Sequence, residues 1–169
     1  MKVAVTGTPG TGKTTATDLL DTDLEVIHLN EIVEEEELYS EVDEERDSLV
    51  VDLEAVEEWL EGKDDFVLDS HLAHLVEDLD KVVVLRCRPR ALEERLRESG
   101  VPGPKAHENA ESEALDIILS EAVERHGEEN VYEIDTTDRT PEEVATEIER
   151  VLAGEREPSA GEVDFTDFL

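Results

Sequence analysis

The residue types and spacing best suited to chemistry lie near the start of the chain, where residues 7–14 read G-T-P-G-T-G-K-T and match G-x-x-x-x-G-K-[ST]. A phosphate chain carries several negative charges, so a site for it needs many N–H donors and little side-chain bulk. The glycines let the backbone curl into a concave ring of N–H groups, and a helix beginning near Lys13 would add its positive end. Lys13 would reach the terminal phosphates, and the Thr14 hydroxyl would ligate Mg²⁺. The alternative is a glycine-rich turn that matches by chance.

The flanking sequence predicts the elements that such a loop requires. Residues 1–6 are a short β-branched run and the loop leads into an apolar pair at residues 19–20, so the order is strand, loop, helix. Further apolar runs predict strands at 25–29, 66–69, 82–86 and 131–135, and helical spacing predicts helices at 14–20, 52–60, 90–98, 110–126 and 141–152. Five strands alternating with helices imply an α/β fold with a parallel sheet covered on both faces.

The chain length of 169 residues suits one domain, which we expect to span residues 1–154. The strongly acidic stretch at 30–62 is interpreted as a small helical lobe. Residues 99–109 contain two glycines and two prolines, which favour a loop or lid over a helix. We expect residues 155–169 to form a disordered acidic tail, although its two phenylalanines could dock on the body or on a partner.

Two side chains near the end of the strand at 66–69 are candidates for catalysis. Asp69 would lie at the carboxyl edge of the sheet, where ligands bind in open α/β folds, and could hold Mg²⁺ through water. A structural aspartate that caps a turn is the alternative. His71 could align a water or an acceptor phosphate, or it could be a packing residue. A transition-metal site of Asp69, His71 and His74 is disfavoured because no cysteine accompanies them.

Phosphoryl transfer also needs cations to balance the spreading negative charge of the transferred group. Arg95, one helical turn after Leu92, is the first candidate to stack on a base or hold a phosphate, and Arg86 at a strand end is the second. The alternative for both is an ordinary arginine that pairs with neighbouring glutamates. Cys87, the single cysteine, excludes an intramolecular disulfide and is interpreted as a small buried residue.

The charge balance is extreme, with 48 acidic and 15 basic residues and a formal net charge of −33. Concentrated salt screens such a surface, whereas dilute buffer leaves it to repel itself. The composition therefore predicts a halophilic, cytoplasmic protein. It also argues against direct nucleic-acid binding, because no basic stripe is present, and no apolar run is long enough to predict a membrane span.

With these motifs in view, the chain resembles a known family. The phosphate loop, the triplet Asp69-Ser70-His71, the L-R-C-R-P…L-x-x-R-L segment at 85–96 and the acidic E-E-E-L-Y…D-E-E segment at 35–45 are similar to those of the atypical adenylate kinases of archaea and eukaryotic nuclei, the sixth isoenzyme type. The resemblance covers roughly residues 1–152. It implies a three-layer P-loop kinase fold with strand order 2-3-1-4-5, a nucleoside monophosphate lobe at about 28–51 and a short lid at about 98–108. It also implies the conversion of MgATP and AMP to two ADP, a second ATPase activity, and a role in small ribosomal subunit (16S rRNA) maturation.

The chain departs from this family at the lid entrance. Ser99-Gly100-Val101 stands where the family usually has R-G-Y, so Arg97 or Lys105 would have to replace the missing lid arginine. Arg139 matches a family position near the adenine, and its alternative is an ordinary turn residue. Arg46 is the only cation between His28 and Gly62, which argues against strict AMP specificity.

Two functions therefore remain open. One is a broad-specificity adenylate kinase with ATP, Mg²⁺ and AMP. The other is an ATPase assembly factor that binds a basic small-subunit ribosomal protein, to which the acidic surface is electrostatically suited. The predicted nucleotide-binding residues are Gly7, Thr8, Gly10, Thr11, Gly12, Lys13, Thr14, Thr15 and Arg139; the catalytic residues are Lys13, Asp69, His71 and Arg95; the metal ligands are Thr14 and Asp69.

Overall fold

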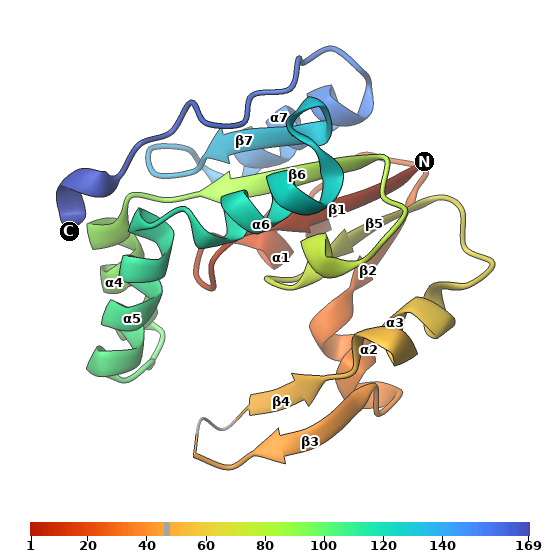
Figure 1. Ribbon diagram of the computed structural model, residues 1–169. Helices are drawn as coiled ribbons and strands as arrows, with labels where there is room; N and C mark the ends of the chain where they lie inside the picture. The colour runs from red at the N-terminus through yellow and green to blue at the C-terminus, as the bar shows by residue number, and fades with distance from the viewer. Residues whose placement is uncertain (46–47) are drawn as a thin grey trace.

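The computed structural model describes residues 1–45 and 48–169 and places a five-stranded parallel sheet at the centre of the protein (Figure 1). Its strands are β1 (Lys2–Thr6), β2 (Glu25–His28), β5 (Phe66–Asp69), β6 (Lys81–Arg86) and β7 (Val131–Asp135). They lie in the order β2-β5-β1-β6-β7, and every neighbouring pair is parallel. Counted along the sheet strands alone this is 2-3-1-4-5, so the predicted α/β fold and strand order are confirmed.

Helices cover both faces of the sheet, as expected for strands that are buried on both sides. The α-helices are α1 (Lys13–Asp18), α2 (Leu29–Glu35), α3 (Leu53–Leu60), α4 (Pro89–Glu98), α5 (Gly103–Ala114), α6 (Ile117–His126) and α7 (Pro141–Leu152), and the 3-10 turns are η1 (Ala73–Leu75), η2 (Glu128–Asn130) and η3 (Thr166–Phe168). Alternate residues of β1 illustrate the two faces. Val3 and Val5 pack with α1 and α7, whereas Ala4 packs with α3 and α6.

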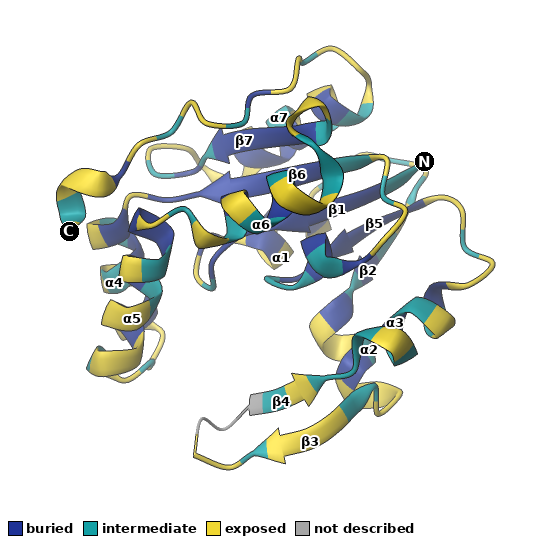
Figure 2. Cartoon of the chain, in the orientation of Figure 1, coloured by how far each residue is buried: buried dark blue, intermediate teal, exposed yellow. Residues whose placement is uncertain are grey.

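The acidic insert between β2 and β5 differs from the helical lobe that we expected. Between α2 and α3 the chain forms an antiparallel hairpin of β3 (Tyr39–Asp43) and β4 (Ser48–Val51). Alternate apolar residues explain it: Tyr39, Leu49 and Val51 pack toward the core cluster, whereas Val42 and Val50 are exposed (Figure 2). The expected lobe at 28–51 includes Arg46, which lies outside the described residues.

The segment after β6 is also more helical than expected. The predicted loop at 99–109 contains the start of α5, which begins at Gly103 and lies beside α4 to form a helical hairpin, called the lid hairpin below (Figure 1). Pro104 is compatible with this start because the first-turn N–H groups of a helix have no intrahelical partner. The single helix expected at 110–126 is split at Asp116, whose left-handed φ of 56° separates α5 from α6.

Residues 155–169 pack against the body, in contrast to the disordered tail that we expected. The segment runs beside β7 (Figure 1), the Ser159 amide donates to the Val131 carbonyl at 3.0 Å, and the Phe165 side chain is buried. Because β7 is the edge strand of the sheet, its outer backbone groups need partners, and the tail supplies them. Among the described residues, no helix has the length and apolarity that crossing a bilayer would require.

Candidate nucleotide-binding site

The phosphate loop joins β1 to α1 in a conformation that only glycine permits at three positions. Gly10 and Gly12 have φ values of 94° and 88°. A Cβ on Gly7 would lie 2.6 Å from the Leu85 carbonyl oxygen, and one on Gly10 would lie 2.9 Å from side-chain carbons of the lid hairpin. The loop is therefore a tight backbone cradle, which is the geometry a phosphate group requires.

Lys13 is held at the centre of this loop. Its Nζ donates to the Gly7 carbonyl at 2.9 Å and to the Thr8 carbonyl at 3.2 Å. Burial lowers the pKa of Lys13 to about 8, although the charges of Asp69 and Glu113 act to raise it. The side chain thus sits beside the backbone that would surround a phosphate.

Asp69 ends β5 next to β1 and gathers hydroxyl groups from α1. It accepts hydrogen bonds from Thr17 Oγ1 at 2.5 Å and from Thr14 Oγ1 at 3.4 Å. The predicted metal ligands Thr14 and Asp69 are therefore adjacent, and hydroxyl and carboxylate oxygens are the hard donors that Mg²⁺ prefers. The arrangement fits a magnesium ion.

Our reading of the sequence did not single out His28, which also touches Asp69. His28 ends β2 in register with Asp69, its Nδ1 lies 2.5 Å from Asp69 Oδ2, and its Nε2 lies 2.7 Å from Asp18 Oδ1. Burial lowers the pKa of His28, but the hydrogen bonds and charges of Asp69 and Asp18 outweigh it, so the pKa is raised. The available signal was a polar residue at the carboxyl end of the neighbouring strand.

His71 and His74 have different surroundings. Burial, followed by the charges of Lys13 and Lys105, lowers the pKa of His71 to about 4, so a neutral imidazole lies close enough to both lysines to sense them. His74 is buried behind the sheet edge, where its Nδ1 shares a 2.7 Å hydrogen bond with Thr6 Oγ1. The charge of Lys13 therefore acts on His71, whereas the groups that act on His74 are Arg125, His126 and His71.

A cavity of about 190 Å³ adjoins the loop on the side away from Asp69. Arg95 of α4 and Arg139 of the segment after β7 line it, together with Gly10, Thr11, Gly12, Thr15, Ala16, Thr136, Pro141 and Val144. The Arg95 Nη2 donates to the Thr136 carbonyl at 3.4 Å. The structure therefore brings the two predicted arginines to one pocket beside the loop, where a flat base could lie between them.

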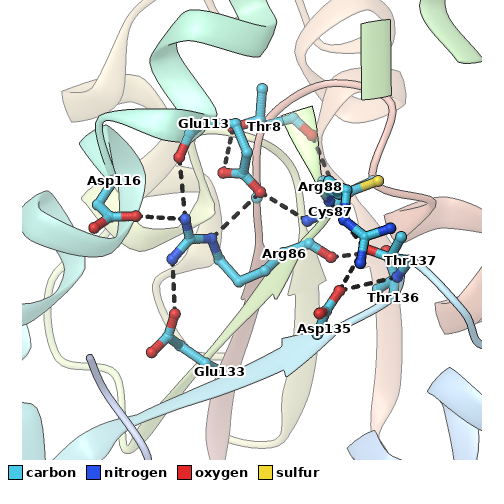
Figure 3. A network of polar contacts seen from close by, with 12 residues as sticks. Thr8, Arg86, Cys87, Arg88, Glu113, Asp116, Glu133, Asp135, Thr136 and Thr137 are labelled. Carbon is cyan, nitrogen blue, oxygen red and sulfur yellow. Dashed lines mark hydrogen bonds and ion pairs between the residues drawn. The ribbon is translucent and has the colours of Figure 1, made fainter. Parts of the chain in front are cut away.

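Arg86, our second candidate for a phosphate-binding cation, was assigned wrongly. Its side chain is 1% exposed and is surrounded by three carboxylates (Figure 3). The guanidinium donates to Glu133 at 2.7 Å, to Glu113 at 3.3 Å and to Asp116 at 2.5 Å. Arg86 is committed to these partners, which belong to α5, to the junction of α5 and α6, and to β7, so it cannot hold a nucleotide.

The two substitutes for the missing lid arginine are placed differently. Arg97 forms a surface pair with Glu93 one helical turn away, at 2.8 Å, and its side chain is 57% exposed. Lys105 lowers the pKa of His71 and lines a cavity of about 610 Å³ at the turn of the lid hairpin. Of the two, Lys105 is nearer to the candidate catalytic residues.

Comparison with known proteins agrees with this geometry. Residues 3–116 match the protein family described as "AAA domain". A protein of Natronomonas pharaonis named "Putative adenylate kinase" is 63% identical over 169 residues, with both chains fully covered. Proteins of the same name are 60% identical over 169 residues in Halobacterium salinarum, and 44% identical over 164 residues in Methanosarcina acetivorans, covering 90% of this chain and 86% of that relative.

Solved structures support the same fold. Shikimate kinase from Bacteroides thetaiotaomicron superposes with a TM-score of 0.59 and 20% identity, covering 90% of this chain and 97% of that one. At this level of identity the likeness shows the P-loop kinase fold alone. Together with the matches along the whole sequence, these findings show that the chain belongs to the P-loop family of the archaeal proteins named putative adenylate kinase.

Proposed function

We propose that the protein is an adenylate kinase that transfers the terminal phosphoryl group of MgATP to AMP and forms two ADP. An oxygen of the AMP phosphate would attack the γ-phosphorus, and the bond from that phosphorus to the β–γ bridging oxygen would break. One observation carries the proposal: Lys13 and the Thr14–Asp69 pair meet at a glycine loop in a chain that is 63% identical over its length to a relative of that name.

The chain's own groups divide the work. The backbone N–H groups of residues 7–14 would bind the phosphates, and Lys13 would neutralise charge on the terminal ones. Thr14 and Asp69 would hold a magnesium ion, which when bound would neutralise charge between the β- and γ-phosphates. Arg95 and Arg139 would flank the base in the pocket that they line.

Polar, uncharged side chains follow Asp69, on the side where an acceptor would bind. Ser70 Oγ donates to Asn30 Oδ1 at 3.0 Å, directly after Asp69 and at the start of α2. His71, with its pKa lowered to about 4, would be neutral at pH 7 and would orient an acceptor phosphate or a water by hydrogen bonding. An acceptor recognised mainly by hydrogen bonds suits broad specificity for nucleoside monophosphates.

A second candidate is favoured by the surface charge. The formal net charge of −33 gives a surface complementary to a basic protein at close range, and four glutamates, three of them in α3, line one surface pocket together with Arg125. In that case the protein would be an ATPase assembly factor that binds a basic small-subunit ribosomal protein during 16S rRNA maturation, and the kinase activity would be secondary.

The rates of ADP and phosphate formation from ATP, with and without AMP in molar KCl, separate the two candidates. The kinase predicts that ADP appears rapidly only when AMP is present. Equal phosphate release without AMP would replace the kinase proposal with the ATPase one. Lys13→Ala should abolish both activities, whereas Lys63→Ala, a control at a partly exposed lysine paired with Glu25, should retain them.

A further inference from the structure

Glu113 is a buried carboxylate that touches the phosphate loop without belonging to it. It lies in the last turn of α5 and is 3% exposed. Its Oε1 accepts from the Thr8 hydroxyl at 3.1 Å, and its Oε2 accepts from the Cys87 amide at 2.8 Å and from Arg86 Nε at 3.3 Å (Figure 3). Three donors from the loop and from the end of β6 therefore converge on one side chain of the lid hairpin.

Thr8 is a central residue of the loop's internal hydrogen bonding. Its carbonyl accepts from the Thr11 hydroxyl at 2.9 Å, from the Thr11 amide at 3.3 Å and from Lys13 Nζ at 3.2 Å. The residue is 2% exposed, so its hydroxyl has no water to replace a lost partner. A contact that fixes the Thr8 side chain therefore also helps to fix the Thr8 carbonyl, which accepts a hydrogen bond from Lys13 Nζ.

The same cluster fixes the point at which the lid hairpin joins the body. Arg86 Nη2 donates to the Glu113 carbonyl at 3.0 Å and to Asp116 Oδ1 at 2.5 Å. Asp116 is the left-handed residue at which α5 ends and α6 begins. The contact from Glu113 to Thr8 therefore joins the phosphate loop to the base of the lid hairpin.

The Glu113 charge is not required to neutralise Arg86. That guanidinium also pairs with Glu133 and Asp116, so three carboxylates surround one cation. Burial raises the pKa of Glu113 even though Arg86 and its hydrogen bonds act to lower it. A buried carboxylate in excess of its cations is costly, and such a group is expected where it serves another purpose.

We propose that Glu113 is a positioning residue that holds Thr8, keeps the loop in its phosphate-binding shape and couples it to the lid hairpin. The proposal rests on the proposed function only in taking the loop as the MgATP site. Glu113 would act through Thr8 and would itself touch no substrate.

Paired substitutions of Thr8 test the contact with little change in volume. Thr8→Val removes the hydroxyl, whereas Thr8→Ser retains it. By calorimetry in molar KCl we expect Thr8→Val to weaken MgATP and MgADP binding about ten-fold, as for loss of one buried hydrogen bond to a charged group. Thr8→Ser should restore affinity to within about three-fold of the wild type. In steady-state assays KM for ATP should rise in Thr8→Val while KM for AMP stays within about two-fold.

Glu113→Gln tests the carboxylate. The Cys87 amide and Arg86 Nε can only donate, so the new NH₂ group must turn toward Thr8. The Thr8 hydroxyl can accept from that group, but its own proton loses the carboxylate acceptor and is left without a partner in a buried site. The variant should reproduce the loss of MgATP affinity, and adding Thr8→Val to it should cause little further loss. Val151→Ala is the control for stability, since this buried residue of α7 belongs to the apolar cluster that covers one face of the sheet, and its truncation should lower stability without changing affinity.

Three results would overturn the proposal: wild-type affinity in Thr8→Val, an equal loss in Thr8→Ser, or independent losses from the two sites. The proposed kinase function fails separately. A wild-type protein that binds MgATP and makes no ADP from AMP refutes the kinase function and leaves this binding test in force, whereas a wild type that does not bind MgATP refutes both.

Discussion

Replacing Arg86 with methionine should destabilise the protein more than any surface change of the same kind. The Arg86 and Glu133 side chains are each 1% exposed, and Glu113 is almost as deeply buried. Arg86→Met would leave their carboxylates without a cation in a site closed to water. Removing one partner of a buried ion pair typically costs about 3–5 kcal/mol, mostly because the remaining charge is uncompensated. The total free energy of unfolding of a natural domain is only about 5–15 kcal/mol.

The lost contact with the tail adds to this cost. The Arg86 guanidinium lies 5.4 Å from the centre of the Phe165 ring, which is close enough for a cation–π interaction. For a domain of this size each kcal/mol shifts the melting temperature by roughly 2–4 °C, so the expected loss is on the order of 10 °C. Urea unfolding followed by circular dichroism at constant molar KCl is the suitable assay, because guanidinium chloride would change the salt concentration.

The matched control is Arg97→Met, which removes an exposed arginine paired with Glu93 on the same helix. Its unfolding midpoint should remain that of the wild type, because exposed pairs contribute little. A loss below about 1 kcal/mol in Arg86→Met would refute the reasoning, since it would mean that the surrounding carboxylates do not depend on the guanidinium.

Three further predictions concern salt, pH and the tail. Lowering KCl from molar to millimolar should reduce the urea midpoint steeply, because the negative charges that give the net charge of −33 then repel one another over much longer distances; unchanged stability would contradict the halophilic interpretation. Burial, together with nearby positive charge, lowers the pKa of His74 to about 4. As the pH falls from 6.5 to 4, the His74 side chain is protonated in the unfolded chain before it is protonated in the folded one, so the wild type loses stability. The free energy of unfolding of the wild type should therefore fall by on the order of 3 kcal/mol relative to that of His74→Asn across that window. Parallel pH curves would count against this. A chain ending at Gly154 should unfold at lower urea and self-associate on size-exclusion chromatography, because the edge of β7 loses the bonds from Ser159 and Arg156; an equally stable monomer would show that the tail is dispensable.

The phosphate loop and the sheet were predictable because their signals are local. Three glycines within six residues permit the loop backbone, and near-continuous apolar runs mark strands that are covered on both faces. The sheet order came from the family resemblance and was confirmed. The lid was misjudged because Gly103 and Pro104 were taken as loop residues, although both are tolerated in the first turn of a helix, where α5 begins.

Arg86 and Arg95 show why roles could not be read from the sequence alone. Both are arginines next to acidic or apolar segments near the carboxyl edge of the sheet. Arg86 finds its partners 27, 30 and 47 residues away, in α5, at Asp116 between α5 and α6, and in β7. Arg95 instead reaches the pocket beside the loop. Only the tertiary arrangement distinguishes a structural cation from one available to a ligand.

In so acidic a sequence, the buried carboxylates cannot be distinguished from those on the surface. In a chain with 48 aspartates and glutamates, an acidic surface accounts for an acidic residue at almost any position, so nothing in the sequence singled out Glu113. Burial separates the groups: Asp69, Glu113 and Glu133 are almost inaccessible to solvent. Salt cannot screen charges that solvent does not reach, so each of these carboxylates needs specific donors from the chain. Glu113 accepts from the phosphate loop, and Asp69 accepts from α1 and His28. Glu133 accepts from Arg86 and the tail. An exposed acidic surface and a rigid site therefore use the same residue types in opposite physical surroundings.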